Sequence, residues 1–465
     1  MTAPDWVSDA VFYQIFPDRF ADGDPTNNPS NVQPWSHPPT IWNFQGGDLK
    51  GIIQKFDYLL DLGVNALYLN PIFFAPSNHR YNTIDYYRID PKLGELQDFR
   101  ALLDLAHKHS FRVILDGVFN HCGRGFFAFN DLLENQEYSP YRDWFYIKRF
   151  PVDAYSPGAA QDYLAWWGIK SLPKFNTNNQ PTRKYLLNIA RYWIEQGIDG
   201  WRLDVPNEIN DDSFWSEFRA TVKKANPEAY LVGEIWTPDL RWVGENHFDG
   251  LLNYPLRDYL IRFIHAETLS ALEFAEKIEN LYSYYPQEIT IAMYNLLGSH
   301  DTERLLTKLD ANIAKTKLAF FFLFSFPGAP GIYYGDEIGL EGDKDPDCRR
   351  TFPWDEHQWN CELRAWVKNL IELRKRRRAL RRGDMRRVWV DNEHSCYVFS
   401  RQEGDEKILA VMNSSGERQP LSIPVEKLNW ENGKVVHNLL NNESLVVANN
   451  RIQIELDAWS GTWLS

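Results

Sequence analysis

The feature that most constrains the fold is an alternation in which short runs of β-forming residues are each followed by a stretch of helical periodicity. The runs lie at residues 11–16, 66–71, 112–118, 199–204, 230–234, 250–255, 296–301 and 331–337. In the stretches 49–63 and 182–197, apolar residues recur at helical spacing and a glycine ends each one. Eight such units are typical of a (β/α)8 (TIM) barrel, so we predict an α/β fold of that class.

Two parts of the chain depart from this alternation. A segment of roughly sixty residues, rich in aromatic side chains and turn formers, follows the third run and is too long for an ordinary loop. We therefore predict a barrel at residues 1–120 and 181–382, with an inserted subdomain at 121–180 on its C-terminal face. Alternating segments such as 407–413 then predict an antiparallel β-sandwich domain at residues 383–465.

The charge of the chain limits its partners. A net charge of -13 argues against nucleic acid and against an anionic membrane surface, because both require a basic footprint. The strongly basic run 374–382 has the composition of a solvated helix end, which we favour over a nucleic-acid contact.

Several features indicate a cytoplasmic protein. Residues 1–10 contain neither the basic nor the apolar part of a signal peptide. The most apolar run, 318–326, is too short to cross a bilayer and predicts a buried helix. The 4 cysteines form no C-x-x-C pair, which is typical of reduced thiols rather than of disulfides or a zinc site.

Polar residues gather at the carboxyl ends of the predicted strands, where the catalytic groups of barrel enzymes lie. They are Asn70, Asp116, Asn120, His121, Arg202, Asp204, Glu234, His300, Asp301, Asp336 and Glu337. One such carboxylate could simply cap a helix, but several on one rim favour a site because unpaired buried charge is costly. A site rich in acids and aromatic rings, with an arginine and without a phosphate loop, suits glycoside hydrolysis, which needs two carboxylates.

Four motifs on these strand ends resemble the signature regions of the α-amylase family of glycoside hydrolases. They are "DGVFNH" (116–121), "GWRLD" (200–204), "GEIW" (233–236) and "GSHD" (298–301). The segments 12–20, 78–87 and 331–350 are similar to the cyclomaltodextrinase, neopullulanase and maltogenic amylase group of that family. The lysine in "LPKFN" (172–176) also resembles this group, whereas oligo-1,6-glucosidases carry an aspartate there.

The resemblance implies a retaining double displacement with Asp204 as nucleophile, Glu234 as general acid and base, and Asp301 as a ligand of the sugar hydroxyls. It also implies a set of substrate-binding residues: Arg202, His121, His300, Tyr81, His79, Asp116, Asp345 and Arg349, with Pro206, Asn207 and Glu208 on the acceptor side of the cut. For Trp166, Trp167 and Phe175, two interpretations stay open, namely platforms for sugar rings or packing of the insertion.

No cofactor is required for this chemistry, but the resemblance suggests a structural calcium site. Its candidate ligands are Asp22, Asp24, Asn27, Asn28, Asp48 and the carbonyl of Gly46. A turn rich in Asx residues and without metal would give the same pattern, so both interpretations stay open.

Two departures from the group carry expectations. The first predicted strand starts at residue 11, so we expect the group's usual N-terminal β-domain to be missing, the cleft to be more open and any homodimer to use another surface. Pro206 stands where relatives commonly have alanine. Since proline fixes φ and removes an N–H donor, we expect altered acceptor binding and a shift towards α-1,6 bonds.

We therefore predict an α-glucan hydrolase acting on α-1,4 and α-1,6 bonds in malto-oligosaccharides, pullulan, cyclodextrins or branched dextrins. A dedicated α-1,6 debranching enzyme is the nearest alternative. A transglycosylase and a catalytically inactive accessory protein are more distant ones, and the presence of Asp204, Glu234 and Asp301 argues against the last.

Overall fold

The computed structural model describes residues 3–266 and 268–465, and it confirms the barrel. Eight parallel strands pair in the spatial order β8-β7-β6-β5-β2-β1-β10-β9, and a bridge between Leu252 and Tyr294 brings the two edges together. The strands are β1 (Phe12–Ile15), β2 (Ala66–Leu69), β5 (Arg112–Gly117), β6 (Gly200–Leu203), β7 (Tyr230–Gly233), β8 (Gly250–Leu251), β9 (Tyr294–Leu296) and β10 (Ala329–Tyr333).

Helices cover the outside of the barrel. The longer ones are α4 (Leu96–Lys108), α6 (Gln180–Glu195), α7 (Asp212–Ala225), α8 (Tyr254–Ile264), α9 (Ala271–Tyr284), α12 (Ile313–Ser325) and α13 (Cys361–Arg376). Shorter ones are α1 (Pro17–Phe20), α2 (Leu49–Gln54), α3 (Phe56–Leu62), α10 (Gln287–Thr290) and α11 (Leu305–Lys308). The apolar run 318–326 lies almost wholly in buried α12, as predicted, and no helix within the described residues is long and apolar enough to cross a membrane.

Two local predictions about helices need correction. The stretch 49–63 is divided at Lys55 into α2 and α3, although Gly63 does end it in the left-handed region at φ 92°. The fifth barrel strand is followed only by the short 3-10 turn Leu240–Trp242, so the expected helical stretch before β8 does not form in the part of the chain that the structure describes.

Side chains alternate between the two sides of the barrel strands. Outward-facing residues such as Trp201 and Leu203 join the large core between the strands and the helices. Inward-facing residues at the N-terminal end of the barrel, such as Phe12, Ile114 and Tyr230, form a separate apolar cluster that fills it. The next inward positions towards the carboxyl ends are polar and belong to the candidate site.

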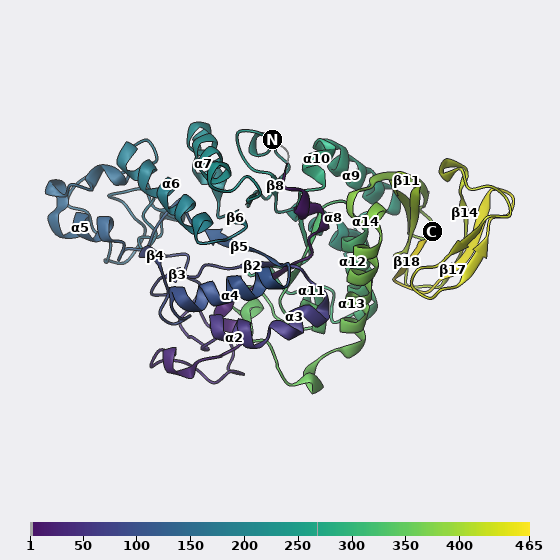
Figure 1. The fold of residues 1–465 in the computed structure, drawn as a ribbon, viewed down its shortest axis with the longest axis horizontal. Helices are drawn as coiled ribbons and strands as arrows, with labels where there is room; N and C mark the ends of the chain where they lie inside the picture. Colours follow the sequence, from purple (N-terminus) through teal and green to yellow (C-terminus); the bar gives the residue numbers. More distant parts are fainter. Residues whose placement is uncertain (1–2, 267) are drawn as a thin grey trace.

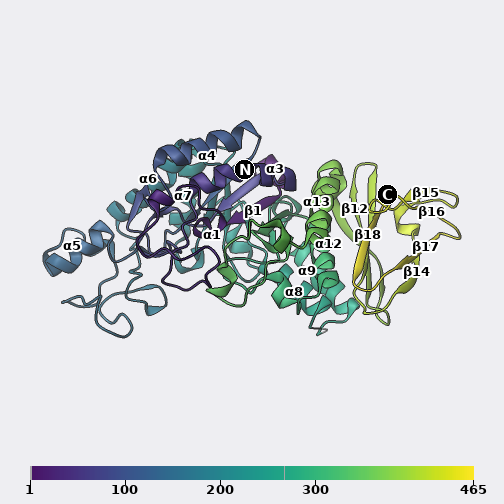
Figure 2. The same cartoon turned by 90° about the horizontal axis from the view of Figure 1, so that it is seen from below.

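The chain leaves the barrel after β5 and returns at α6. The excursion contains α5 (Phe127–Asn135) and short 3-10 turns, and the small β3 (Phe73–Phe74) and β4 (Asp85–Ile89) pair elsewhere, after β2. Asn179 starts α6 by accepting the N–H of Thr182 on its side chain, with a proline in the first turn. The insertion and the C-terminal domain lie at opposite ends of the molecule (Figures 1 and 2).

The C-terminal domain packs two antiparallel sheets against each other. One sheet has the order β11-β12-β13-β18, formed by Asp384–Asp391, Cys396–Glu403, Glu406–Asn413 and Ser460–Leu464. Facing it are β14 (Gln419–Pro424) with β17 (Arg451–Leu456), while β15 (Val435–His437) pairs with β16 (Ser444–Val446). Alternate residues of β13 divide between two cores, since Leu409 and Val411 lie between the sheets whereas Ala410 and Met412 pack on the barrel.

The basic run 374–382 belongs to this junction, and the prediction that it is a solvated helix end is wrong for its first residue. Arg374 is fully buried and donates hydrogen bonds to the carbonyls of Phe324 (2.9 Å), Gly328 (2.6 Å) and Leu380 (2.6 Å). The run continues in α14 (Arg378–Arg382), whose last arginine donates to Asp9 at 2.8 Å. These arginines hold the barrel, the N-terminal segment and the β-domain together.

Candidate active site

Arg202 is the centre of the candidate site. It lies on β6 opposite Asp116 of β5 in the strand register, and both side chains point into the barrel. Its Nη1 donates to Asp116 Oδ1 at 2.7 Å and to Asp204 Oδ1 at 3.0 Å, and its Nη2 lies 2.8 Å from Glu234 Oε2. Asp204 and Glu234 are the next inward positions beyond their strands, so one buried guanidinium holds both predicted catalytic carboxyls.

The charges of this cluster do not balance. Three carboxyl groups contact the Arg202 guanidinium, so full ionisation would leave excess negative charge in a buried place. Burial raises the pKa of Glu234 above its ordinary value, while Arg202 acts against the shift. Burial also raises the pKa of Asp204, again against Arg202 and with the negative charges of Glu234 and Asp116 adding to it. Both shifts favour retention of a proton by the pair Asp204 and Glu234, and the two carboxyls titrate together.

Asp116 is held from below by neutral donors. The hydroxyls of Tyr68 and Tyr81 each donate to its Oδ2 at 2.7 Å, and Asn70 Nδ2 lies 3.3 Å from the same oxygen. Because Asp116 accepts these bonds and the Arg202 bond together, it fixes the height and tilt of the guanidinium. Asp116 thus positions the groups that act on substrate.

Val205 has a strained backbone directly after Asp204. Its φ of 36° and ψ of 51° lie in the left-handed region, which is unfavourable for a β-branched residue and costs about 1–3 kcal/mol. In this conformation the N–H of Val205 donates to Glu234 Oε2 at 3.0 Å. Pro206 follows as the first residue of the 3-10 turn Pro206–Glu208 and limits the conformations that the preceding residue can adopt. The Val-Pro pair therefore links the Asp204 loop to Glu234.

His300, Asp301 and Arg349 form one side of the site. His300 Nδ1 lies 3.0 Å from the amide nitrogen of Gln14 and therefore accepts, so its Nε2 carries the proton. That Nε2 lies 2.5 Å from the Tyr81 hydroxyl and 3.0 Å from Asp301 Oδ2. Although burial opposes it, the hydrogen bond from His300 and the charge of Arg349 hold the pKa of Asp301 below its usual range, so Asp301 is ionised. Its side chain is 32% exposed and reaches into the cleft.

The remaining predicted residues on this side continue outward. His79 stacks on Tyr81 with ring centres 5.9 Å apart, and burial lowers the pKa of His79 to about 3. Asp345 is exposed and pairs with Arg349 at 3.0 Å. These residues form a wall that runs from Tyr81 to Asp345, which we call the donor wall: Tyr81, His79, His300, Asp301, Arg349 and Asp345.

His121 lies next to Tyr81 and His79 and has a ring nitrogen that can donate a hydrogen bond. Burial lowers the pKa of His121 to about 3, so its ring is neutral. Asn120 Nδ2 lies 3.1 Å from Nδ1, which leaves the proton on Nε2, and this buried atom has no partner among the described residues. Trp166 stacks on His121 at 5.5 Å, and the 80% exposed Trp167 stacks on Trp166 at 4.5 Å. The structure thus brings both tryptophans to the site.

Phe175 and the 206–208 turn are placed differently. Phe175 is buried and stacks on Phe145 at 5.7 Å, so it packs the insertion and the interpretation as a sugar platform is wrong for it. Asn207 is exposed, and the carbonyl of Glu208 accepts a short hydrogen bond from Lys174 Nζ. The lysine of the "LPKFN" segment thereby anchors this turn beside the site.

Sequence reasoning did not single out two residues of the site. Gln14 is a buried polar residue inside an apolar strand, which was the available signal, and it donates to His300. Trp236 stands two residues after Glu234, is 49% exposed and stacks on Tyr254 at 3.7 Å. Nothing in the sequence places Tyr254 under Trp236, because the two belong to different segments.

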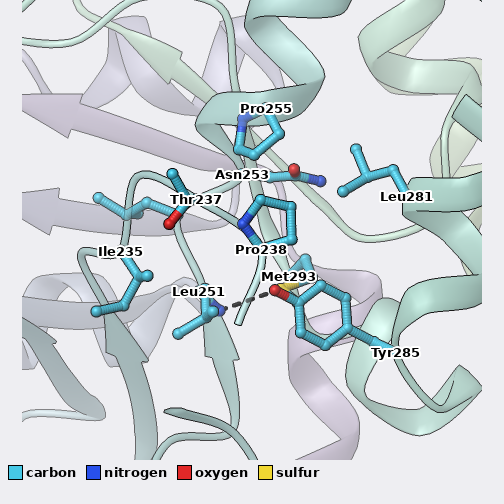
Figure 3. A pocket seen from close by; sticks show the side chains of 10 residues that line it. Ile235, Thr237, Pro238, Leu251, Asn253, Pro255, Leu281, Tyr285 and Met293 are labelled. Atoms are coloured by element: carbon cyan, nitrogen blue, oxygen red, sulfur yellow. Dashed lines mark hydrogen bonds between the residues drawn. The ribbon is translucent and has the colours of Figure 1, made fainter. Parts of the chain in front are cut away.

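An open hollow of about 200 Å³ lies beyond Glu234 (Figure 3). Its lining is mostly apolar and includes Ile235, Pro238, Leu251, Leu281, Tyr285 and Met293, with the Leu251 N–H donating to Met293 Sδ at 3.2 Å. Among the described residues that line it there is no carboxylate, histidine, lysine or arginine. Chemistry therefore belongs to the Arg202 cluster and not to this hollow.

The loop proposed to hold calcium has two oxygens suited to a cation. The side-chain nitrogen of Asn27 donates to Asp48 at 2.9 Å and that of Asn28 donates to Asp22 at 2.8 Å, which fixes both amides. Their Oδ1 atoms are buried without a partner among the described residues. A Cβ added to Gly46 would lie 2.3 Å from Asn28 Oδ1, so glycine leaves the room that this oxygen needs. This donor set fits Ca²⁺.

Asp24 is placed less favourably for a metal. One of its oxygens bonds Lys50 Nζ at 2.6 Å and the other bonds the backbone and hydroxyl of Thr26. Asp48 accepts the N–H groups of Gly23 and Gly51 besides Asn27. Asn27, Asn28 and Asp22 are thus the side chains best placed to bind a cation.

Comparison with known proteins also indicates a glycoside hydrolase, in agreement with the geometry of the site. The model of the alpha amylase catalytic domain matches residues 14–402, and that of the maltogenic amylase C-terminal domain matches residues 385–463. The chain is 46% identical to a cyclomaltodextrinase from Geobacillus thermopakistaniensis, over 95% of this chain and 74% of that protein.

Two similar structures cover the whole chain. The cyclic α-maltosyl-(1→6)-maltose hydrolase from Arthrobacter globiformis superposes with a TM-score of 0.91 at 39% identity, over 100% of both chains. The debranching enzyme of Nostoc punctiforme gives a TM-score of 0.91 at 40% identity, over 100% of this chain and 99% of that one. These matches confirm the predicted resemblance and the predicted fold.

The electrostatics of the site predict opposite stability effects for two Asp→Asn variants. The folded-state pKa of Asp204 is raised, so its contribution to stability is present at low pH and is lost as pH rises through that pKa. Asp204→Asn removes this penalty, and we expect a gain of about 1 kcal/mol in the free energy of unfolding at pH 8 and a smaller one at pH 5.

Asp301→Asn is the matched control with the opposite sign. The folded-state pKa of Asp301 is lowered, so its stabilisation is present at neutral pH and is lost as pH falls through that pKa. We expect Asp301→Asn to lower the thermal midpoint at pH 8. Urea and thermal unfolding between pH 4 and 8 measure both effects. Equal losses in the two variants would contradict this account of the charges.

Proposed function

This chain belongs to the α-amylase family of glycoside hydrolases, and on that basis we propose that it cleaves α-glucosidic bonds in two steps with retention of the anomeric configuration. The observation that carries the proposal is the Arg202 guanidinium, which contacts Asp204 and Glu234 through neighbouring nitrogens at 3.0 and 2.8 Å. Two carboxyls held this close suit a retaining mechanism, which needs about 5–5.5 Å between them, better than an inverting one.

In the first step, Asp204 attacks the anomeric carbon while Glu234 protonates the departing glycosidic oxygen. We assign the proton to Glu234 because this step requires an ionised Asp204, and Arg202 contacts both carboxyls at 3.0 and 2.8 Å. The bond between the anomeric carbon and the glycosidic oxygen breaks, and an ester with Asp204 forms. Glu234, now ionised, then takes a proton from water, whose oxygen attacks the anomeric carbon and releases Asp204.

The other polar residues hold the sugar. The ionised Asp301 accepts hydrogen bonds from the hydroxyls of the reacting glucose, and the neutral His121 donates from its free Nε2. Tyr81 lies nearly parallel to His300, with an interplanar angle of 8°, and contributes an aromatic surface beside that glucose. Trp166 and Trp167 extend the surface along the insertion, and Asn207 and Glu208 lie on the acceptor side.

We propose that both α-1,4 and α-1,6 bonds are cleaved. The cyclomaltodextrinase similarity favours α-1,4 cleavage, and two full-length structural neighbours are a debranching enzyme and a hydrolase named for a (1→6)-linked ring. The strained Val205-Pro206 pair beside Glu234 is the structural feature through which this chain differs on the acceptor side. A dedicated α-1,6 debranching enzyme is the second candidate, favoured by the Nostoc neighbour.

We also propose a structural calcium ion bound by Asn27, Asn28 and Asp22. Bound there, it would tie the loop after β1 to the start of α2 and take no part in bond cleavage. A cytoplasmic location is proposed as well, supported by the free thiols of Cys122, Cys348, Cys361 and Cys396.

Replacing the general acid tests the mechanism. In Glu234→Gln, kcat on maltotriose should fall by about 100- to 10,000-fold, because no proton reaches the leaving oxygen. α-Maltosyl fluoride needs no such proton, so it should still form an ester on Asp204 that mass spectrometry detects. Azide should release this ester as α-maltosyl azide. Asp204→Asn is the contrasting variant and should form no ester from either substrate.

The wild-type enzyme should also show the titration of this acid. Since the acid is active when protonated and burial raises its pKa, kcat/KM should fall on the alkaline side at a pH above the ordinary range of a glutamate. An ester on another residue, or an alkaline limb that persists on maltosyl fluoride, would contradict the assignment.

Pullulan distinguishes the linkages. Panose reports α-1,4 cleavage and maltotriose reports α-1,6 cleavage, and we expect both from the wild-type enzyme. Pro206→Ala relaxes the backbone after Val205 and should change the ratio of the two products, with α-1,6 cleavage reduced. Maltotriose as the sole product would favour the dedicated debranching enzyme. An unchanged ratio in Pro206→Ala would show that this proline does not select the bond.

Removal of calcium tests the metal site through stability. Calcium at about 100 times its Kd should add about 2.7 kcal/mol to the free energy of unfolding, and a chelator should remove this gain. Asn28→Ala should abolish the calcium-dependent shift in thermal midpoint. Asp24→Asn should keep it, because both oxygens of Asp24 are engaged by Lys50 and Thr26. A midpoint that calcium does not move in the wild-type protein would refute the site.

A further inference from the structure

Trp42 lies on the long loop between β1 and α2 and is 79% exposed. We propose that its indole ring is an outer platform for a glucose unit of the donor strand, beyond the donor wall, and so sets a preference for longer chains. The inference rests on the proposed function and deepens it by naming a residue that determines chain-length specificity.

The backbone around Trp42 is fixed on both sides. The N–H groups of Trp42 and Asn43 donate to Thr40 Oγ1 at 3.2 and 3.1 Å, while Asn43 Oδ1 accepts the N–H of Thr40 at 2.8 Å. Asn78 Nδ2 then donates to the carbonyls of Thr40 (3.0 Å) and Asn43 (2.7 Å). These hydrogen bonds close residues 40–43 into a turn, and the Trp42 side chain projects from that turn.

The same bonds place the turn at the donor wall. Asn78 is followed directly by His79, the outer ring of the stack on Tyr81. From the other side, the buried Arg19 donates to the carbonyl of Asn43 at 3.0 Å and to that of Arg349 at 3.3 Å. The turn that carries Trp42 is therefore bonded to both segments from which the donor wall is built.

Exposure of a single tryptophan would not by itself indicate a binding site, since single apolar residues on a surface are ordinary. What distinguishes Trp42 is the position of its turn at the donor wall. Leaving an indole in water forfeits the free energy that its burial would bring, and the hydrogen-bonded backbone fixes the point from which the indole projects. A flat apolar face in a fixed place suits the flat side of a pyranose ring, at little cost in conformational entropy on binding.

Chain-length dependence tests the platform. The substrates are p-nitrophenyl malto-oligosides of three to seven glucose units. We would measure kcat/KM and the position of the cut for the wild-type enzyme and for Trp42→Ala, Trp42→Phe and Tyr138→Ala. Tyr138 is the matched control, because it is 85% exposed and lies beside α5 at the outer end of the insertion. Thermal midpoints show whether each variant is folded.

In Trp42→Ala the ratio of kcat/KM on the longest to that on the shortest substrate should fall by about 3- to 10-fold, and the cut should shift towards the non-reducing end. Trp42→Phe should restore most of the ratio, and Tyr138→Ala should leave it at the wild-type value. A loss that is equal at all lengths, or no loss, would overturn the proposal for Trp42. Failure of the wild-type enzyme on every substrate would instead refute the proposed function.

Discussion

The pairing of Arg202 with three carboxyl groups is the interaction on which the rest of this site depends. Burying a charged guanidinium is costly unless it is paired, and Asp116, Asp204 and Glu234 pair with Arg202 at 2.7, 3.0 and 2.8 Å. The surplus of acid over base favours a proton in the cluster, and the pKa values of Asp204 and Glu234 are both raised accordingly. Chemistry that needs one protonated and one ionised carboxyl thus follows from a charge count, with the barrel providing the confinement.

The neutral groups around this cluster donate hydrogen bonds to Asp116 without adding charge. Tyr68, Tyr81 and Asn70 satisfy Asp116 without adding another cation, so the excess of negative charge is preserved. Burial keeps His121 and His79 uncharged, so both rings can form hydrogen bonds without adding positive charge to the site. The ionised Asp301 pairs with Arg349 and accepts a hydrogen bond from His300 on the donor wall. Two electrostatic units therefore meet across the cleft.

Much of this could be predicted because strand ends meet in a barrel wherever the alternation of the chain is clear. Asp116, Arg202 and Glu234 were visible as strand-end residues, and their convergence followed from parallel pairing. Contacts between segments distant in the sequence were not visible, as with the burial of Arg374 under the C-terminal domain or the stacking of Trp236 on Tyr254. Those depend on how the loops and domains pack, for which local periodicity carries no information.

Val205 connects the Glu234 carboxyl to the Pro206–Glu208 turn. Its left-handed backbone is unfavourable in isolation, yet it directs an N–H at the Glu234 carboxyl and turns the chain into the Pro206–Glu208 turn. Lys174 of the insertion bonds the end of that turn, so the position of the acid is coupled to the insertion and to the acceptor side. The backbone strain of Val205, next to Asp204, is thereby offset by contacts of the turn with the insertion, such as the bond from Lys174 to Glu208. Changes in the 206–208 turn can therefore alter the position of the Glu234 carboxyl without touching Glu234 itself.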